Sequence, residues 1–202
     1  MDKAYKTIRS PARAKIAVGA CRFISSLSPC QNEREAKSFI QDVKKKFHDA
    51  THNAYAYRIL SETDIIARSN DDGEPAGTAG APMLAVLEKN ELVNVVLVGT
   101  RYFGGVKLGI GGLIRAYRSC AEAGLKEVDI CLKVPELQVV VEVSYDHIGV
   151  VLREAASTQA EIEGIDYREK VAVMMKLRKK SWSSFKRRLK DATSGQVTFF
   201  IK

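Results

Sequence analysis

One stretch of the chain has residue types and spacing that favour the binding of an anion. Five glycines fall within nine positions of residues 100–117, and basic side chains flank them. The residues are Arg101, Gly104, Gly105, Lys107, Gly109, Gly111, Gly112 and Arg115. A glycine-rich turn that opens a helix leaves backbone N–H groups unpaired at the positive end of the helix dipole, where anions bind. The predicted ligand is a phosphate or carboxylate group. The alternative is a tight strand-to-helix connection whose glycines serve packing alone.

Two nucleotide-binding signatures are excluded by the spacing of this stretch. It contains no Gly-Lys-Ser/Thr sequence, and no acidic residue is suitably placed at the end of a following strand. A Walker A loop needs the first feature and a Rossmann fingerprint needs the second. The predicted anion site therefore belongs to neither class.

A histidine and an acidic turn add candidates for proton transfer. His52 follows Asp49 in a polar segment, and it suits a general acid or base or a phosphate donor. The alternative is a histidine fixed by hydrogen bonds where a loop meets a strand. Asp72 and Glu74 are the further catalytic candidates, but no serine or cysteine nucleophile can be assigned. We expect His52, Asp72, Glu74, Arg101 and Lys107 to line one face.

The acidic turn at Asp71, Asp72 and Glu74 has two interpretations. The carboxylates hold a hard cation such as Mg²⁺, or they pair with Arg101, Lys107 or the glycine-loop amides. Pairing is favoured, because a tight Mg²⁺ site also uses waters or substrate phosphates. We therefore assign no metal and no cofactor. Residues 77–82 open a second helix with Thr78 as the expected cap, and this helix start is a candidate second wall of the anion site.

Basic residues dominate the last predicted helix and the strand before it. Residues 176–190 carry eight basic side chains and no acidic one. A solvated helix face usually mixes the two signs, so this run favours contact with nucleic acid over simple solvation. The predicted nucleic-acid-binding residues are Lys179, Lys180, Lys186, Arg187, Arg188 and Lys190.

Hydrophobic patterns place these motifs on two successive sets of elements. The first set is predicted as βαββαβα, with residues 16–24 as one strand and residues 92–98 as a buried strand ahead of the glycine turn. Pro135 marks the boundary between domains 1–134 and 135–202. The second set is predicted as βαββαβ, with Asp146 as a helix cap, and this order is ferredoxin-like. The chain is therefore expected to be an α+β protein.

Composition limits the function classes. The 202 residues carry a net charge of +8, which favours anionic partners and nucleic acid in particular. No run of 18 apolar residues is present, so a membrane span is not expected. The four cysteines form no C-x-x-C pair, which predicts reduced thiols and a cytoplasmic location.

Three separated motifs together resemble the signature of the YigZ/IMPACT family. They are Asp49-Ala-Thr-His-Asn-Ala-Tyr-Ala-Tyr57, Asp71-Asp-Gly-Glu-Pro-Ala-Gly-Thr-Ala-Gly80 with Pro82-Met-Leu84, and Arg101-Tyr-Phe-Gly-Gly105 with Lys107-Leu-Gly109 and Gly111-Gly-Leu113. The resemblance covers about two-thirds of the chain and favours a bacterial two-domain member. It departs at Ile110, where family members usually carry a small or hydroxylated residue, so a ligand pocket there is expected to be tighter.

The resemblance carries expectations for fold and function. It implies an N-terminal domain like domain 2 of ribosomal protein S5, a sheet with helices packed on one face. It also implies a C-terminal ferredoxin-like domain similar to one in the translocation factor EF-G. The expected function is a cytosolic, translation-associated regulator that binds RNA, the ribosome or another anionic partner through the glycine-rich turn and the basic faces. A regulator that binds a protein partner is a further alternative. The alternative is an enzyme acting on a phosphorylated small molecule or nucleotide at His52, Asp72, Glu74 and Arg101. Ligand identity and oligomeric state stay open.

Overall fold

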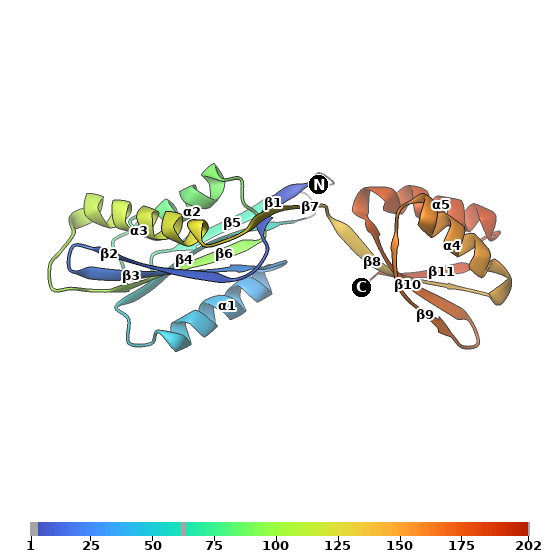
Figure 1. The fold of residues 1–202 in the computed structure, drawn as a ribbon, viewed down its shortest axis with the longest axis horizontal. Coiled ribbons are helices and arrows are strands. Elements are labelled where there is room, and N and C mark those ends of the chain that lie inside the picture. Colours follow the sequence, from blue (N-terminus) through green and yellow to red (C-terminus); the bar gives the residue numbers. More distant parts are fainter. Residues whose placement is uncertain (1–3, 62–63, 202) are drawn as a thin grey trace. The chain divides into compact units, whose positions relative to one another are not determined.

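The computed structural model describes residues 4–61 and 64–201. The described residues 5–133 and 134–201 form two compact units, and each unit contains its own sheet and helices (Figure 1). The protein is therefore a two-domain α+β protein, in agreement with the predicted fold class.

The first unit is built on a five-stranded antiparallel sheet in the order β2-β3-β6-β4-β5. Its strands are β2 (Ala12–Val18), β3 (Cys21–Pro29), β6 (Val95–Tyr102), β4 (His52–Leu60) and β5 (Ile65–Asn70). A two-stranded sheet pairs β1 (Tyr5–Ile8) with β7 (Ile130–Lys133). The helices are α1 (Glu33–Lys46), α2 (Gly80–Lys89) and α3 (Gly109–Lys126).

Helices cover both faces of the five-stranded sheet, so the expectation that they pack on one face is wrong. Figure 1 shows α2 and α3 on one side of the sheet and α1 on the other. The cause lies in β6, which is apolar on both faces. Val95 and Leu97 join the core under α2 and α3, whereas Val96 and Val98 pack with Ile40 and other residues of α1. A strand buried on both faces needs a cover on each side.

Three local expectations for the first unit also need correction. Residues 16–24 do not form one strand, because the chain reverses between β2 and β3 at Gly19, whose φ of +58° suits a tight turn. Strands β1 and β7 were not predicted, since each has only four residues. Thr78 does not cap α2, because its hydroxyl donates to the Pro75 carbonyl oxygen instead.

The second unit contains the predicted βαββαβ series. Its elements are β8 (Glu136–Val143), α4 (Ile148–Ser157), β9 (Glu161–Tyr167), β10 (Val171–Arg178), α5 (Trp182–Ala192) and β11 (Val197–Ile201). The antiparallel sheet has the order β11-β8-β10-β9. Core residues such as Val141, Val173 and Phe185 lie between this sheet and the two helices. Asp146 lies in a 3₁₀ turn before α4 and makes no capping bond, so that expectation is wrong.

Two of the four cysteines are buried thiols that stay protonated. Cys21, Cys30, Cys120 and Cys131 are all free thiols. Burial raises the pKa of both Cys30 and Cys120 to about 12, so these thiols stay protonated at neutral pH. Within the described ranges, the helices are too short or too polar to cross a membrane.

Helix α3 approaches β3 closely at one glycine, and this contact generates a stability prediction. A Cβ atom at Gly124 would lie 2.2 Å from Ser25 Oγ and 2.3 Å from Leu27 Cδ1. Overpacking costs about 1–3 kcal/mol and exceeds the helix-propensity gain of about 1 kcal/mol. Gly124→Ala should therefore lower the free energy of unfolding, measured by urea denaturation. Gly149→Ala in α4 is the control, because a Cβ there meets nothing within 4 Å. Equal effects of the two substitutions would contradict this packing.

Candidate functional site

Four of the five residues expected on one face line a single cavity of about 410 Å³ in the first unit. His52, Glu74, Arg101 and Lys107 lie on its wall, together with Phe103. Antiparallel pairing of β4 with β6 explains why His52 and Arg101 meet, because the two residues lie directly opposite each other on these strands. The distant sequence motifs therefore converge at one cavity, and Asp72 is the expected residue that does not line it.

A buried ion pair occupies the centre of this site. Arg101 Nη1 donates to Glu74 Oε1 at 2.9 Å and to Oε2 at 3.1 Å. Only 5% of Arg101 and 8% of Glu74 is exposed. Tyr117, on the inner face of α3, donates its O–H to Glu74 Oε1 at 2.7 Å. The pair therefore joins the acidic turn, β6 and α3.

The remaining contacts of Arg101 are also internal. Its Nη2 donates to Cys21 Sγ at 3.4 Å, and its guanidinium lies 5.4 Å from the centre of the Phe103 ring. Burial opposes the charge of Arg101, but the hydrogen bonds to Cys21 and Glu74 outweigh burial and raise its pKa. Its buried Nε has no hydrogen-bond partner among the described residues. The N–H group at Arg101 Nε is therefore a hydrogen-bond donor that no described residue uses.

His52 is held in a defined orientation. Its Nδ1 lies 2.8 Å from the backbone oxygen of Asp72. A carbonyl oxygen can only accept, so Nδ1 carries the proton and the neutral ring leaves Nε2 unprotonated. That Nε2 is 3.8 Å from Glu74 Oε2 at the cavity wall. His52 can therefore accept a proton or a hydrogen bond from a molecule in the cavity.

Each carboxylate of the acidic turn already has its own partners. Asp71 accepts hydrogen bonds from the backbone N–H groups of Gly77, Ala79 and Gly80, at 2.8, 2.9 and 2.8 Å. Asp72 accepts from Lys44 Nζ at 2.5 Å and from the Asn53 N–H at 2.7 Å. Pairing was expected with Arg101, Lys107 or the glycine-loop amides, and only Glu74 pairs with one of these, Arg101. Asp71 and Asp72 have other partners, and among the described residues no acidic, histidine or cysteine cluster is suited to a metal ion.

The start of α2 is not a second wall of the anion site. Its free N–H groups are the ones that Asp71 binds, so an external anion would have to displace that carboxylate. The start of α3 differs, because its cap residue Leu108 makes no side-chain hydrogen bond to the helix amides. The open helix terminus in this unit therefore belongs to α3, beside Lys107.

The glycines of the turn have separate roles. Gly105 and Gly109 have φ values of +87° and +69°, which L-residues rarely adopt. Gly104 instead allows close packing, since a Cβ there would lie 1.9 Å from the backbone oxygen of Ala20 in the β2–β3 turn. Gly111 and Gly112 belong to the first turn of α3, and the exposed Arg115 is not among the residues that line the cavity.

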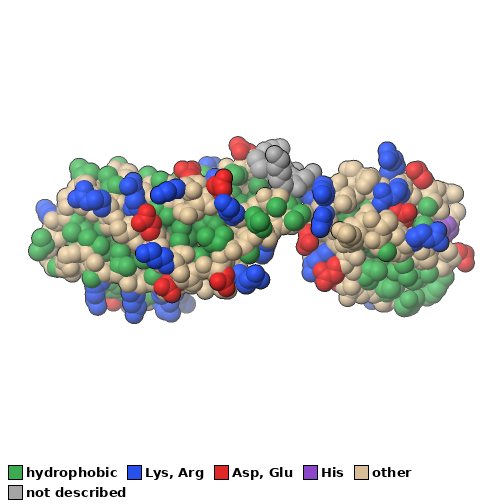
Figure 2. All heavy atoms as spheres, turned by 45° about the horizontal axis from the view of Figure 1, so that its top comes forward, with side chains coloured by type: hydrophobic (Ala, Val, Ile, Leu, Met, Phe, Trp, Pro, Cys, Tyr) green, Lys and Arg blue, Asp and Glu red, His purple; other side chains and the backbone are tan. Residues whose placement is uncertain are grey.

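The basic residues near α5 are partly neutralised by neighbouring elements. Arg188 Nε donates to Glu154 Oε2 of α4 at 2.6 Å, and Lys176 pairs with Glu163 of β9. Lys186 lies 5.7 Å from the centre of the Trp182 ring. Figure 2 shows Lys and Arg side chains over both units on the visible face, with Asp and Glu among them. The exposed charges left along this segment are those of Arg178, Lys180, Arg187 and Lys190.

Sequence reasoning missed the polar role of Tyr117. The spacing of this residue in α3 places it among the buried, mostly apolar positions of that helix, where no polar role is evident. Burial and the hydrogen bond to Glu74 raise the pKa of Tyr117 well above its usual range, so it acts as a fixed O–H donor. A tyrosine on an otherwise apolar helix face was the available signal, because a buried O–H needs a partner.

Comparisons with known proteins identify both units. Residues 20–125 match the family described as the Impact N-terminal domain, and residues 141–196 match a domain of unknown function, DUF1949. All three sequence motifs lie within the first match. The fold and the site thus define a protein with an Impact N-terminal domain followed by a second α+β domain.

The chain belongs to the IMPACT family, as its motifs indicated. IMPACT family member YvyE of Bacillus subtilis is 38% identical over 198 residues, which cover 97% of this chain and 90% of that protein. IMPACT family member YigZ of Escherichia coli is 30% identical, with 87% of each chain covered. A crystal structure of a hypothetical protein, 26% identical, superposes with a TM-score of 0.73 and covers 99% of this chain and 98% of its own.

The buried pair leads to a prediction about stability. Glu74→Gln leaves the Arg101 charge buried without a counter-charge, which typically costs about 3–5 kcal/mol. Adding Arg101→Met removes that charge and should restore part of the loss. A double-mutant cycle measured by urea denaturation checks this coupling. Additive effects of the two substitutions would show that the pair does not act as a unit.

The capping role of Asp71 leads to a pH prediction. Burial opposes ionisation of Asp71, but three backbone hydrogen bonds outweigh burial and lower its pKa. Because the pKa of Asp71 is lower in the folded than in the unfolded protein, its ionised form stabilises the fold. This stabilisation is complete above the usual carboxyl pKa of about 3.9, and it is lost as the pH falls through the pKa of Asp71 in the folded protein. Asp71→Ala should cost about 0.5–2 kcal/mol at pH 7 and progressively less below about pH 4.

Thermal melting of the wild type and Asp71→Ala between pH 7 and pH 2 measures this effect. Asp42→Ala is the control, because Asp42 is exposed on α1. A stability difference for Asp71→Ala that stays constant over the whole pH range would rule out the ionised cap.

Proposed function

We propose that this protein is a cytoplasmic, translation-associated regulator that binds RNA through its phosphates. The observation that carries the proposal is the cavity of about 410 Å³ beside the uncapped start of α3. The cavity wall contains three side chains that are basic, Lys107, Arg101 and His52, and one carboxylate, that of Glu74. A helix start with an excess of basic side chains favours a phosphate group.

Charge and membership in the IMPACT family support the proposal. The net charge of +8 favours nucleic acid, and exposed Lys180, Arg187 and Lys190 offer phosphate contacts on the second unit. The family resemblance drawn from the motifs implies a role in translation. The same proposal assigns residues 1–134 to an S5-domain-2-like fold and residues 135–202 to a ferredoxin-like fold. The βαββαβ order of the second unit supports the latter assignment.

Salt-dependent RNA binding tests the proposal. The wild type should bind a fluorescent single-stranded RNA, and the logarithm of the binding constant should fall linearly with the logarithm of salt concentration. Lys107→Gln, and separately Arg187→Gln with Lys190→Gln, should flatten this slope by about 0.7 per lost phosphate contact. The control replaces Arg34 and Lys37 by glutamine, because both are exposed on α1.

Fluorescence anisotropy at four or more salt concentrations gives these slopes. Absence of RNA binding by the wild type would overturn the proposal. Equal slopes for all variants would remove Lys107 and α5 from the RNA-binding surface, and the assignment of those residues would then be wrong.

A second candidate is an enzyme acting on a phosphorylated small molecule or nucleotide. The fixed orientation of His52 favours it, because Nδ1 is bonded to the Asp72 backbone oxygen and Nε2 lies at the cavity wall. Asp72 would contribute only through its backbone, since its carboxylate binds Lys44 and Asn53. Release of inorganic phosphate from nucleoside phosphates, lost in His52→Asn, would support this candidate. No release by the wild type would count against it.

A further inference from the structure

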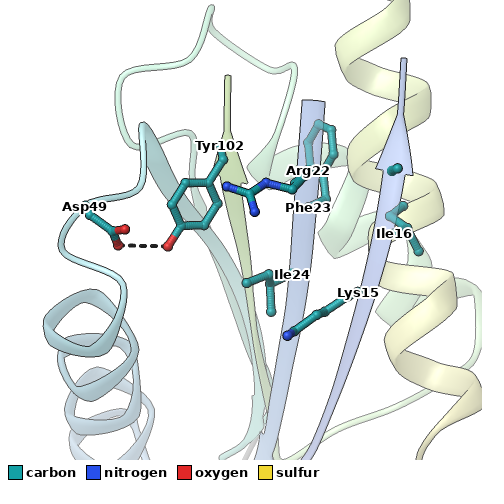
Figure 3. A pocket seen from close by; sticks show the side chains of 8 residues that line it. Lys15, Ile16, Arg22, Phe23, Ile24, Asp49 and Tyr102 are labelled. Carbon is teal, nitrogen blue, oxygen red and sulfur yellow. Dashed lines mark hydrogen bonds between the residues drawn. The ribbon is translucent and has the colours of Figure 1, made fainter. Parts of the chain in front are cut away.

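A second cavity, of about 500 Å³, lies in the first unit at strands β2, β3 and β6. We call it the β2–β3 groove and define it by Lys15, Arg22, Ile24, Asp49 and Tyr102 (Figure 3). Helix α1 packs against β4 and β6 on this face of the sheet and leaves β2 uncovered. The groove is therefore an open part of a sheet face, separate from the cavity at Arg101.

Strand geometry separates the two cavities. Arg101 and Tyr102 are consecutive in β6, so their side chains point to opposite faces of the sheet. Cross-strand pairing then gathers the groove residues on the Tyr102 face. Arg22 of β3 is paired with Tyr102, and Lys15 of β2 is paired with Ile24. The buried Ile24 forms an apolar floor beside the exposed Lys15 and Arg22.

Arg22 is held with its guanidinium against an aromatic ring. Its Cζ lies 5.1 Å from the centre of the Tyr102 ring, and the Tyr102 O–H donates to Asp49 Oδ1 at 2.8 Å. Figure 3 shows this arrangement, with Asp49, the Tyr102 ring and Arg22 in sequence above Ile24 and Lys15. The carboxylate fixes the ring and the ring supports the guanidinium. Such a guanidinium plane is a surface on which an unstacked base can lie.

The positive charges of Lys15 and Arg22 in the groove are not paired with carboxylates of the described residues. The structure records ion pairs for other basic residues, but within its described ranges it records none for Lys15 or Arg22. Arg13 projects from the same face of β2 and lies 5.1 Å from the centre of the Phe47 ring. Asp49, the one carboxylate among the residues that line the groove, accepts a hydrogen bond from Tyr102, and its single negative charge faces the two positive charges of Lys15 and Arg22. The groove therefore presents basic side chains, an apolar floor and a flat stacking surface.

We propose that the β2–β3 groove binds single-stranded RNA, with a base stacked on Arg22 and a backbone phosphate at Lys15. This inference rests on the proposed RNA-binding function and names a site for it. Aromatic or guanidinium stacking beside basic side chains is the usual means of binding unpaired nucleotides without sequence choice. An inorganic phosphate would use neither the apolar floor nor the stacking surface, and an acidic peptide has no base to stack.

Separate substitutions distinguish stacking from charge. Tyr102→Leu removes the support of Arg22 but no charge, so it should weaken RNA binding at least about fivefold and leave the salt slope unchanged. Lys15→Gln should flatten the slope by about 0.7. Tyr102→Phe keeps the ring and should bind nearly as the wild type. Lys126→Gln, on the last turn of α3, is the matched charge control.

The measurement is fluorescence anisotropy with a labelled single-stranded RNA at four or more salt concentrations. A weaker affinity with an unchanged salt slope in Tyr102→Leu, together with a flatter salt slope in Lys15→Gln, supports the groove. Wild-type affinity in both variants overturns the groove and leaves the proposed function standing. No RNA binding by the unaltered protein overturns the proposed function itself. Polyglutamate binding that equals RNA binding and is lost in the same variants overturns the assignment to nucleic acid.

Discussion

The need to neutralise a buried arginine organises the first unit. Arg101 lies in the central strand of a five-stranded sheet, where an unpaired charge would cost several kcal/mol. Glu74 supplies the counter-charge, and Tyr117 completes the coordination of that carboxylate. Three elements that are distant in sequence are thereby fixed to one another, and the cavity follows from their arrangement.

The other acidic residues of the turn act in the same way on different neighbours. Asp71 satisfies the first amides of α2, and Asp72 joins the end of α1 to the start of β4. A cluster that looks like a cation site in the sequence is thus three independent connections. The helix start that lacks such an internal anion is that of α3, and this contrast underlies the proposed phosphate site.

The sequence carried enough information for the three helices and the longer strands of the first unit, for the element order of the second unit, for the family and for the meeting of His52 with Arg101. The sequence did not show which group each carboxylate binds. Asp71, Asp72 and Glu74 are equivalent in charge, and only the tertiary structure gives each of them a different partner. Helix α1 was predicted, but its position on the second face of the sheet was not, although the unbroken apolar run of β6 already indicated burial on both sides. The β2–β3 groove was also missed, since Lys15 and Arg22 look like ordinary surface residues until the ladder brings them beside Tyr102.

The alternation at Arg101 and Tyr102 also constrains how this family can change by insertion and deletion. One residue gained or lost within β6 would turn Arg101 toward the groove and Tyr102 toward Glu74, so it would abolish both sites at once. Length variation among relatives should therefore avoid this strand and collect in loops whose ends make no such contacts. Single substitutions, in contrast, can alter either cavity alone, so the two proposed binding surfaces can evolve separately on one strand.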